Sequence, residues 1–152
     1  MLAWRIAKKV YALDRVGMGA RLVGGRWNSA GVAVVYAGLS PEIASLEKLV
    51  HTSDFLPIDL VLVEMNLPVQ VSLYQKFTIG DLPVGWDSLP SSAAAQVIGD
   101  SFVKEGRYLG MVVPSVIMPE ANNIVLNPNH PKFKSVTMKI IRSFEFDSRL
   151  TR

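Results

Sequence analysis

The sequence predicts an α+β fold: a single compact domain, residues 1–152, with a β-sheet core flanked by helices. The chain of 152 residues is long enough to bury one substantial core, and 49% of its residues are apolar, as in globular domains. Short apolar runs typical of strands outnumber the helix patterns, and no repeat or linker divides the chain. These elements do not form repeated βαβ units, which argues against Rossmann and TIM-barrel folds.

Apolar runs bounded by glycine, proline or polar residues predict the strands. They cover residues 2–6, 32–37, 60–66, 69–74, 109–113, 123–126 and 136–146. Pro114 ends the run at 109–113, because proline cannot donate a hydrogen bond to a neighbouring strand. Glycines and prolines within residues 77–90 predict a loop before the second helix.

Two helices are predicted from the residues at their ends. Ser40, Pro41 and Glu42 supply a hydroxyl N-cap, a proline at the first helical position and an acid in the first turn. A helix is therefore expected from residue 41 to about residue 52. The second helix covers residues 91–105, and Gly106 directly after it is typical of a helix C-terminus.

Residues 17–31 form a long glycine-rich connection, and its length alone suggests a function. No helix signal follows Gly17 and Gly19, so the segment is predicted to be irregular. Its last part, residues 24–31, encloses Arg26 in the sequence GGRWNSAG. Glycines let the backbone approach a ligand closely, and a guanidinium suits phosphate oxygens. The run is either a surface turn with a packed tryptophan or a phosphate-binding loop.

Glu47 falls where the first helix would normally carry a core residue. Ile43, Glu47 and Val50 are spaced by four and three residues, so they share one helical face. A buried carboxylate is costly unless it is paired or faces a ligand. Either Glu47 reaches solvent or pairs with His51 one turn later, or it projects into a cleft near residues 24–31.

Three further polar residues each allow two interpretations. Arg5 lies in an apolar strand and needs a carboxylate or a ligand phosphate as its partner. Tyr36 ends a buried strand and is either a core residue or part of a site. Ser115 follows Pro114 just past a strand end, where it either caps a turn or faces a ligand.

Composition excludes several classes of function. The chain has no cysteine, which excludes disulfides, thiolate zinc sites and a cysteine nucleophile. Its two histidines lack metal-binding spacing, so no metal site is predicted. Neither a G-x-S-x-G elbow nor a P-loop pattern is present in the sequence.

Charge and hydropathy limit the partners and the location. The formal net charge of +3 is too small for a dedicated nucleic-acid binder, but it suits a polyanionic small molecule such as a dinucleotide, or an acidic protein. No apolar run approaches the ~20 residues of a membrane span, and the N-terminus lacks a signal-peptide pattern. We therefore expect a cytoplasmic protein with no direct nucleic-acid binding and no membrane contact.

A series of motifs along nearly the whole chain resembles the RES domain family. The motifs are Trp4-Arg5, Gly17-x-Gly19-Ala20, the run at 24–31, Val35-Tyr36, Ala44-x-x-Glu47, Val113-Pro114-Ser115 and Asn127-Pro128-x-His130-Pro131-x-Phe133. The resemblance implies the toxin half of a bacterial type II toxin–antitoxin pair. The implied partner is an Xre-family helix-turn-helix antitoxin, in a hetero-oligomer with antitoxin dimers. The resemblance also implies a fold similar to ADP-ribosyltransferases and a chemistry that consumes NAD⁺ as its substrate, with no cofactor required.

The same resemblance implies that Glu47, Arg26, Tyr36 and Ser115 are catalytic, and that Arg5, Arg26, Tyr36 and Ser115 bind NAD⁺. The ExE pair of arginine-specific ADP-ribosyltransferases is missing. In this assignment Glu47 stabilises the charge that develops on the ribose, hydrogen-bonds a ribose hydroxyl or orients a nucleophile, and Arg26 and Arg5 hold the diphosphate. Tyr36 stacks on nicotinamide or binds ribose, and Ser115 holds a phosphate or the nicotinamide amide.

The expected reaction is cleavage of the nicotinamide–ribose bond by water or inorganic phosphate, which would deplete NAD⁺ and arrest growth. The family resemblance equally allows transfer of ADP-ribose to a host protein. A third hypothesis, from a different class, is a non-catalytic module that recognises a nucleotide or a partner.

Overall fold

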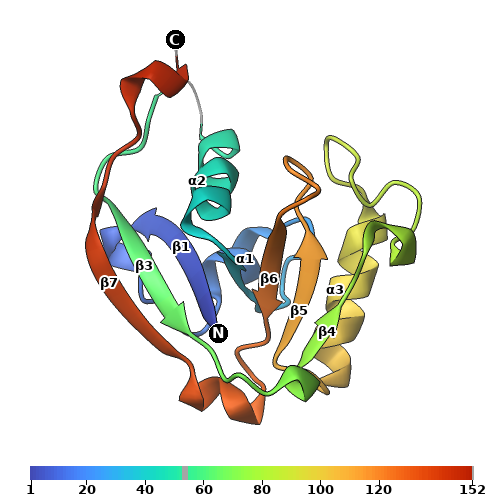
Figure 1. Cartoon of the computed structure of the whole chain (residues 1–152). Helices are drawn as coiled ribbons and strands as arrows, with labels where there is room; N and C mark the ends of the chain where they lie inside the picture. Colours follow the sequence, from blue (N-terminus) through green and yellow to red (C-terminus); the bar gives the residue numbers. More distant parts are fainter. Residues whose placement is uncertain (53–54, 152) are drawn as a thin grey trace.

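One seven-stranded sheet runs through the molecule in the order β4-β5-β6-β2-β1-β3-β7 (Figure 1). Its strands are β1 Leu2–Lys8, β2 Val35–Gly38, β3 Leu60–Asn66, β4 Tyr74–Lys76, β5 Gly110–Pro114, β6 Asn122–Leu126 and β7 Thr137–Phe144. Neighbouring strands are antiparallel apart from the parallel pair β4 and β5. The α-helices of the described residues are α1 Met18–Val23, α2 Pro41–Val50 and α3 Ala93–Glu105. This computed structural model, which describes residues 1–52 and 55–151, confirms the predicted α+β fold.

The sheet is nearly divided between β1 and β2. Every residue of β1 from Leu2 to Lys8 pairs with β3, whereas the ladder between β1 and β2 contains the single pair Trp4 and Gly38. In Figure 1, β1, β3 and β7 lie together on the left, and β6, β5 and β4 diverge from them on the right. Because so few residues pair at this border, the two halves of the sheet leave room for a site between them.

Helix α2 packs against β1 and β2 at this border. It begins as predicted: Ser40 is the N-cap, and its Oγ accepts a hydrogen bond from the backbone N–H of Ile43. Gly38 permits close packing here, since a Cβ at this position would lie 2.6 Å from Cγ2 of Ile43. The helix ends at Val50, slightly before the predicted end at residue 52.

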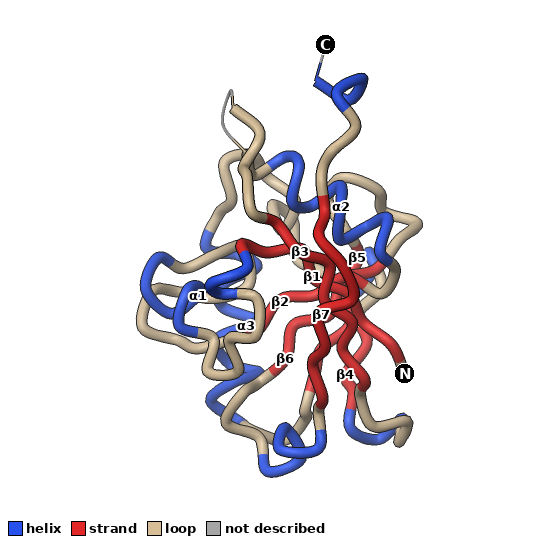
Figure 2. Tube along the Cα trace, turned by 90° about the vertical axis from the view of Figure 1, so that its left-hand side faces the viewer, coloured by secondary structure: helices blue, strands red, loops and turns tan. Residues whose placement is uncertain are grey.

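Helices α1 and α3 lie together on one side of the strands (Figure 2). Ser92 is the N-cap of α3, and Gly106 ends the helix in the left-handed conformation, with a φ of 61°. Phe102 of α3 packs with Met111 of β5 in one core cluster. The alternate strand residues, which point to the opposite face, form a second cluster that includes Val112, Ile124 and Leu126.

The glycine-rich segment 17–31 is not irregular throughout, because Met18–Val23 form α1. The N-cap of this helix is Gly17, and the prediction missed the acidic side chain that binds the N–H groups before and at the helix start. The carboxylate of Asp14 accepts hydrogen bonds from the backbone N–H groups of Val16, Gly17 and Met18, at 2.9, 3.1 and 2.9 Å. These bonds satisfy donors at the helix start that would otherwise have no acceptor.

The predicted strand at residues 69–74 is wrong over most of its length. Val71–Leu73 form a 3-10 helix, and the strand that follows is the short β4. Strand β2 also begins later than predicted, because the carbonyl of Val32 accepts a hydrogen bond from Nδ2 of Asn28 instead of pairing in the sheet. Across residues 1–52 and 55–151, no helix is both long and apolar enough to cross a membrane.

Candidate active site

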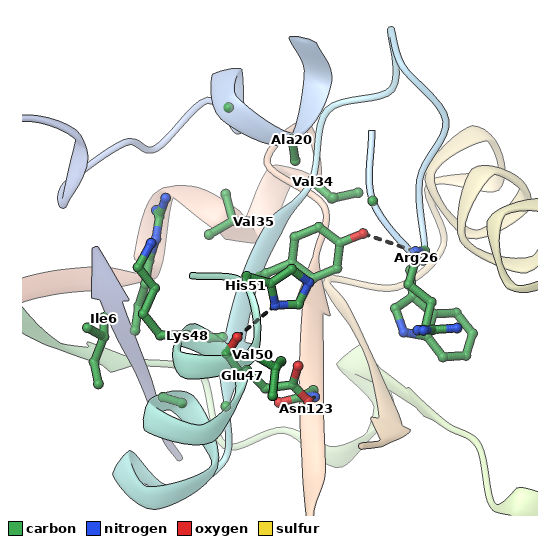
Figure 3. Close-up of a pocket in the computed structure, with 18 of the residues that line it drawn as sticks. Ile6, Ala20, Arg26, Val34, Val35, Glu47, Lys48, Val50, His51 and Asn123 are labelled. Carbon is green, nitrogen blue, oxygen red and sulfur yellow. Dashed lines mark hydrogen bonds between the residues drawn. The ribbon is translucent and has the colours of Figure 1, made fainter. Parts of the chain in front are cut away.

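A cleft of about 940 Å³ opens at the border between β1 and β2 (Figure 3). Its lining comes from β1, β2, α2, β6, the segment 17–27, residues 89 and 91, and the end of β5 with the turn after it. It includes Arg5, Arg26, Tyr36, Glu47 and Asn123. Cavities of this size are typical of small-molecule sites, which combine apolar walls with a few polar groups. Of the five predicted site residues, all but Ser115 line this one cleft.

Glu47 projects from α2 into the cleft, and its carboxylate is anchored on one side. Oε1 accepts hydrogen bonds from Oγ of Ser115 at 2.8 Å and from Nδ2 of Asn123 at 2.6 Å. His51 contacts the backbone carbonyl of Glu47 and not its carboxylate, with 2.7 Å between Nδ1 and that oxygen. Among the described residues, Oε2 of Glu47 takes part in no hydrogen bond, so it is available to a ligand.

Ser115 lies directly behind Glu47, and none of its surface is exposed. Besides donating to Glu47, its Oγ accepts hydrogen bonds from the backbone N–H groups of Ile117 and Met118, at 3.1 and 3.2 Å. The residue therefore caps the turn after β5 and holds the carboxylate at the same time. Because it does not line the cleft, its connection to a ligand there runs through Glu47.

Asn123 is a site residue that the sequence analysis did not identify. It lies on β6 opposite Gly38 of β2, and Figure 3 shows it beside Glu47. Its amide reaches across to α2, where Nδ2 donates to Oε1 of Glu47. In the sequence, the only signal was an asparagine beside the apolar run of this strand, and that signal did not indicate Glu47 as its partner.

Residues 24–31 form a tight turn that its own side chains hold in place. The N–H of Gly25 donates to the carbonyl of Asn28 at 2.9 Å, and Gly24 has a φ of 74°. Asn28 is fully buried, and its Nδ2 donates to backbone carbonyls on both sides of the turn. Trp27 is buried as well. The run thus contains a turn with a packed tryptophan, and it also presents Arg26 to the cleft.

Tyr36 connects this turn to β2. Its hydroxyl donates to Oδ1 of Asn28 at 2.7 Å and accepts a hydrogen bond from the N–H of Trp27 at 3.0 Å. Burial raises the pKa of Tyr36 above its usual value, so the phenol stays protonated at neutral pH. Because the hydroxyl is already engaged, the ring is the part of Tyr36 that can meet a ligand in the cleft.

Arg26 lines the cleft and also anchors a distant loop. Its Nη1 donates to the carbonyls of Trp86 at 2.8 Å and Ser88 at 3.1 Å. These bonds connect the turn at 24–31 to the loop predicted at 77–90, and they fix the direction of the guanidinium. Its other nitrogens make no hydrogen bond with the described residues and remain available as donors.

Arg5 has no carboxylate as a hydrogen-bond partner among the described residues. Its hydrogen bond runs from Nη1 to the backbone carbonyl of Asp14, at 3.4 Å. Burial lowers the pKa of Arg5, and the negative charge of Asp14 opposes that change. Lys48 of α2, which was not predicted from the sequence, also lines the cleft. These cations suit an anionic ligand, and no cluster of three or more His, Cys, Asp or Glu occurs in the described ranges to hold a metal ion.

Comparison with known proteins identifies the family. The sequence profile of the RES domain matches residues 2–147. The chain is 40% identical to "Prs ADP-ribosylating toxin" of Sphingobium sp. (strain YBL2), over 98% of this chain and 96% of that protein. It is 36% identical to "Toxin Res" of Yersinia enterocolitica and 39% identical to "Toxin Res" of Pseudomonas putida, with 99% of both chains covered in each case.

The fold also occurs in a solved structure. The crystal structure of the M. tuberculosis MbcT-MbcA toxin–antitoxin complex matches with a TM-score of 0.68 and 16% sequence identity, over 99% of this chain and 86% of that chain. At this identity the likeness shows a common fold. The family profile and the full-length relatives confirm the resemblance predicted from the motifs: the chain belongs to the RES domain family.

Proposed function

We propose that this chain is the toxin of a bacterial toxin–antitoxin pair and that it cleaves NAD⁺ at the nicotinamide–ribose bond. Three relatives aligned over nearly their full length are named toxins, and one of them is named an ADP-ribosylating toxin. ADP-ribosylation requires this bond of NAD⁺ to break, so the name supports NAD⁺ as the substrate. Depletion of NAD⁺ would then arrest growth.

The observation that carries the proposal is the anchored carboxylate of Glu47 in the cleft. When the C1′–N bond breaks, its electron pair leaves with the nicotinamide nitrogen, and positive charge develops on the ribose. Nicotinamide leaves as a neutral base, so no strong general acid is required. A negative charge held in place beside the ribose stabilises the transition state, because it does not have to reorganise during the reaction.

The other residues of the cleft hold the rest of the dinucleotide. Arg26 and Arg5 bind the diphosphate, since a planar guanidinium with several donors fits phosphate oxygens. The ring of Tyr36 packs against nicotinamide or ribose. Ser115 acts as a positioning residue, through its hydrogen bond to Glu47. NAD⁺ is the substrate, and the mechanism requires no further cofactor.

The acceptor is water or inorganic phosphate. Its oxygen forms the new bond to C1′ as the C1′–N bond breaks, and the acceptor O–H releases its proton to bulk water. The products are therefore nicotinamide, a proton and either ADP-ribose or its phosphorylated form. A second candidate reaction transfers ADP-ribose to a protein side chain. The name of the Sphingobium relative favours this second reaction.

Incubation of the purified chain with labelled NAD⁺ separates these reactions. Free nicotinamide is followed in buffer without phosphate, in buffer with phosphate, and in a cell lysate. Release in buffer alone indicates hydrolysis, release that depends on phosphate indicates phosphorolysis, and label attached to protein indicates transfer. Intact NAD⁺ in all three mixtures contradicts the proposal and favours the non-catalytic binding module.

We also propose that the partner is an Xre-family helix-turn-helix antitoxin that covers the mouth of the cleft, in a hetero-oligomer with antitoxin dimers. The solved structure with the same fold is a toxin–antitoxin complex. Val23, Val50 and Leu89 line the cleft with 82%, 56% and 80% of their surfaces exposed, so the mouth offers apolar contact area. A copurified complex that retains full NAD⁺ turnover would contradict this arrangement.

A further inference from the structure

Arg5 of β1 borders the cleft with most of its hydrogen-bond donors unused. A guanidinium carries five N–H donors in a fixed plane. Among the described residues Arg5 uses one, in the 3.4 Å hydrogen bond to the carbonyl of Asp14. Burial lowers its pKa, so the charge is partly removed from water without full compensation by the protein. A ligand with several acceptor oxygens would complete these hydrogen bonds.

Lys48 approaches the same part of the cleft from α2. Burial lowers the pKa of its ammonium group, and the positive charges of Lys8 and Arg5 lower it further. These cations therefore lie close enough to repel one another. Arg5 and Lys48 both line the cleft. In the view of Figure 3, Lys48 and Arg26 lie on opposite sides of His51.

The nearby acidic groups do not neutralise Arg5 and Lys48 by direct pairing. The carboxylate of Asp14 is occupied by three backbone N–H groups at the start of α1. Within residues 1–52 and 55–151, neither Arg5 nor Lys48 forms an ion pair. The ion pair in these residues joins Asp147 to Arg149, near the end of the chain. Like charges held together without a bonded counter-charge attract an anion, because its binding relieves their repulsion.

We propose that Arg5 and Lys48 form a binding site for a phosphate group at the β1–α2 side of the cleft. The guanidinium of Arg5 offers two parallel donors to two phosphate oxygens, and the ammonium of Lys48 adds a compact charge. The phosphate belongs either to the diphosphate of the dinucleotide or to a free phosphate ion. The connection to NAD⁺ rests on the proposed function, whereas phosphate binding by these two residues does not.

Calorimetric titration of protein that carries Glu47→Gln tests this site by equilibrium binding, without turnover. The probes are ADP-ribose, which contains the diphosphate, adenosine, which has no phosphate, and inorganic phosphate. In this background Lys48→Met removes the charge and preserves much of the side-chain length, and Lys48→Arg restores the charge. Lys104→Met, on the exposed surface of α3, is the matched control.

We expect Lys48→Met to weaken ADP-ribose binding by about tenfold, as for the loss of one charge-assisted hydrogen bond, with adenosine binding unchanged. Lys48→Arg should recover most of the affinity, and Lys104→Met should bind like its parent. A loss confined to inorganic phosphate would also support the site and would identify its ligand as a free phosphate ion. Equal affinities of all variants for both phosphate probes, or an equal loss for adenosine, would overturn the proposal.

Nicotinamide release by the wild-type chain is measured in parallel. If NAD⁺ stays intact but Lys48→Met still weakens binding of a phosphate probe, the proposed reaction fails and the phosphate site stands. If NAD⁺ is cleaved and Lys48→Met binds both phosphate probes like its parent, the reaction stands and the phosphate site fails.

Discussion

Oγ of Ser115 donates a 2.8 Å hydrogen bond to Oε1 of Glu47, across 68 residues of sequence. The bond joins the turn after β5 to α2. Asn123 on β6 donates to the same oxygen at 2.6 Å. The direction of the carboxylate therefore depends on how α2 packs against the sheet, so a change in this packing is expected to alter catalysis as well as stability.

Replacing Ser115 with alanine should reduce both stability and NAD⁺ cleavage. The change leaves the N–H groups of Ile117 and Met118 without their acceptor, and we expect the free energy of unfolding to fall by about 1–3 kcal/mol. Nicotinamide release should fall by about tenfold, because a carboxylate with one donor left is positioned less well. Urea denaturation and the release assay measure the two effects. Ser101→Ala, on the exposed surface of α3, is the control, and equal behaviour of the two variants would contradict the positioning role.

Replacing Tyr36 with phenylalanine should destabilise the turn at 24–31. The buried Oδ1 of Asn28 loses its donor, so the free energy of unfolding should fall by about 1–3 kcal/mol near neutral pH. The ring stays in place, so nicotinamide release should fall much less than in Glu47→Gln. If Tyr36→Phe abolishes release while the fold remains intact, the hydroxyl has a direct catalytic role that our account does not give it.

The stability of the wild-type chain should decline above pH 10.0, the ordinary pKa of tyrosine. Burial raises the pKa of Tyr36, so above that pH the folded state retains a proton that the unfolded chain loses, and each further rise in pH favours unfolding. Tyr36→Phe should show a shallower decline in urea-unfolding experiments. Some decline remains, because burial raises the pKa of Tyr74 to about 12. Identical slopes for the two proteins would contradict this prediction.

Replacing glycine with alanine should have opposite effects on stability at Gly99 and at Gly19. A Cβ at Gly99 of α3 would lie 1.6 Å from the carbonyl oxygen of Trp27, so Gly99→Ala must displace α3 from the turn and should cost at least about 3 kcal/mol. At Gly19 of α1, apart from its chain neighbours and the backbone of its own helix, no atom lies within 4 Å of an added Cβ. Gly19→Ala should therefore stabilise the chain by about 0.5–1 kcal/mol. Thermal unfolding of the pair tests the packing, and a wild-type melting temperature for Gly99→Ala would show that it is wrong.

Arg26→Ala should weaken NAD⁺ binding and loosen the loop at 77–90. Loss of a guanidinium contact to the diphosphate should raise KM by about tenfold. Loss of the hydrogen bonds to Trp86 and Ser88 should lower the free energy of unfolding by about 1–2 kcal/mol. Steady-state kinetics and urea denaturation separate these effects, with the exposed Arg107→Ala as the control. A reduced stability with an unchanged KM would assign Arg26 to anchoring alone.

Local signals predicted most of the fold. The strand predicted at residues 60–66 is β3. The helix predicted at 91–105 is α3, which begins at Ala93 after the N-cap Ser92 and ends at the predicted residue. Both segments combine a clear apolar pattern with strong residues at their ends. Helix α1 was missed because Asp14, whose carboxylate accepts hydrogen bonds from the N–H groups before and at the helix start, lies before the glycines that marked the segment as irregular.

The site was predicted in part. The helical period placed Glu47 on the apolar side of its helix, where it would reach solvent, pair with His51 or project into a cleft, and the structure shows that it lines the cleft. Asn123 and Lys48 were not found, because their importance depends on strand pairing and on charges brought together by the fold. The two carbonyl partners of Arg26 come from a loop whose path is not encoded in any local pattern.

Release of nicotinamide from NAD⁺ by the wild-type chain and by Glu47→Gln, measured side by side, shows whether the Glu47 carboxylate drives cleavage. Glutamine retains an oxygen that can accept from Ser115 and Asn123, so the fold should persist with nearly the same melting temperature. We predict that the wild type releases nicotinamide and that Glu47→Gln does so at least about 100-fold more slowly, because the charge that stabilises the ribose is gone. Release by Glu47→Gln at the wild-type rate, or intact NAD⁺ with both proteins, would contradict the account.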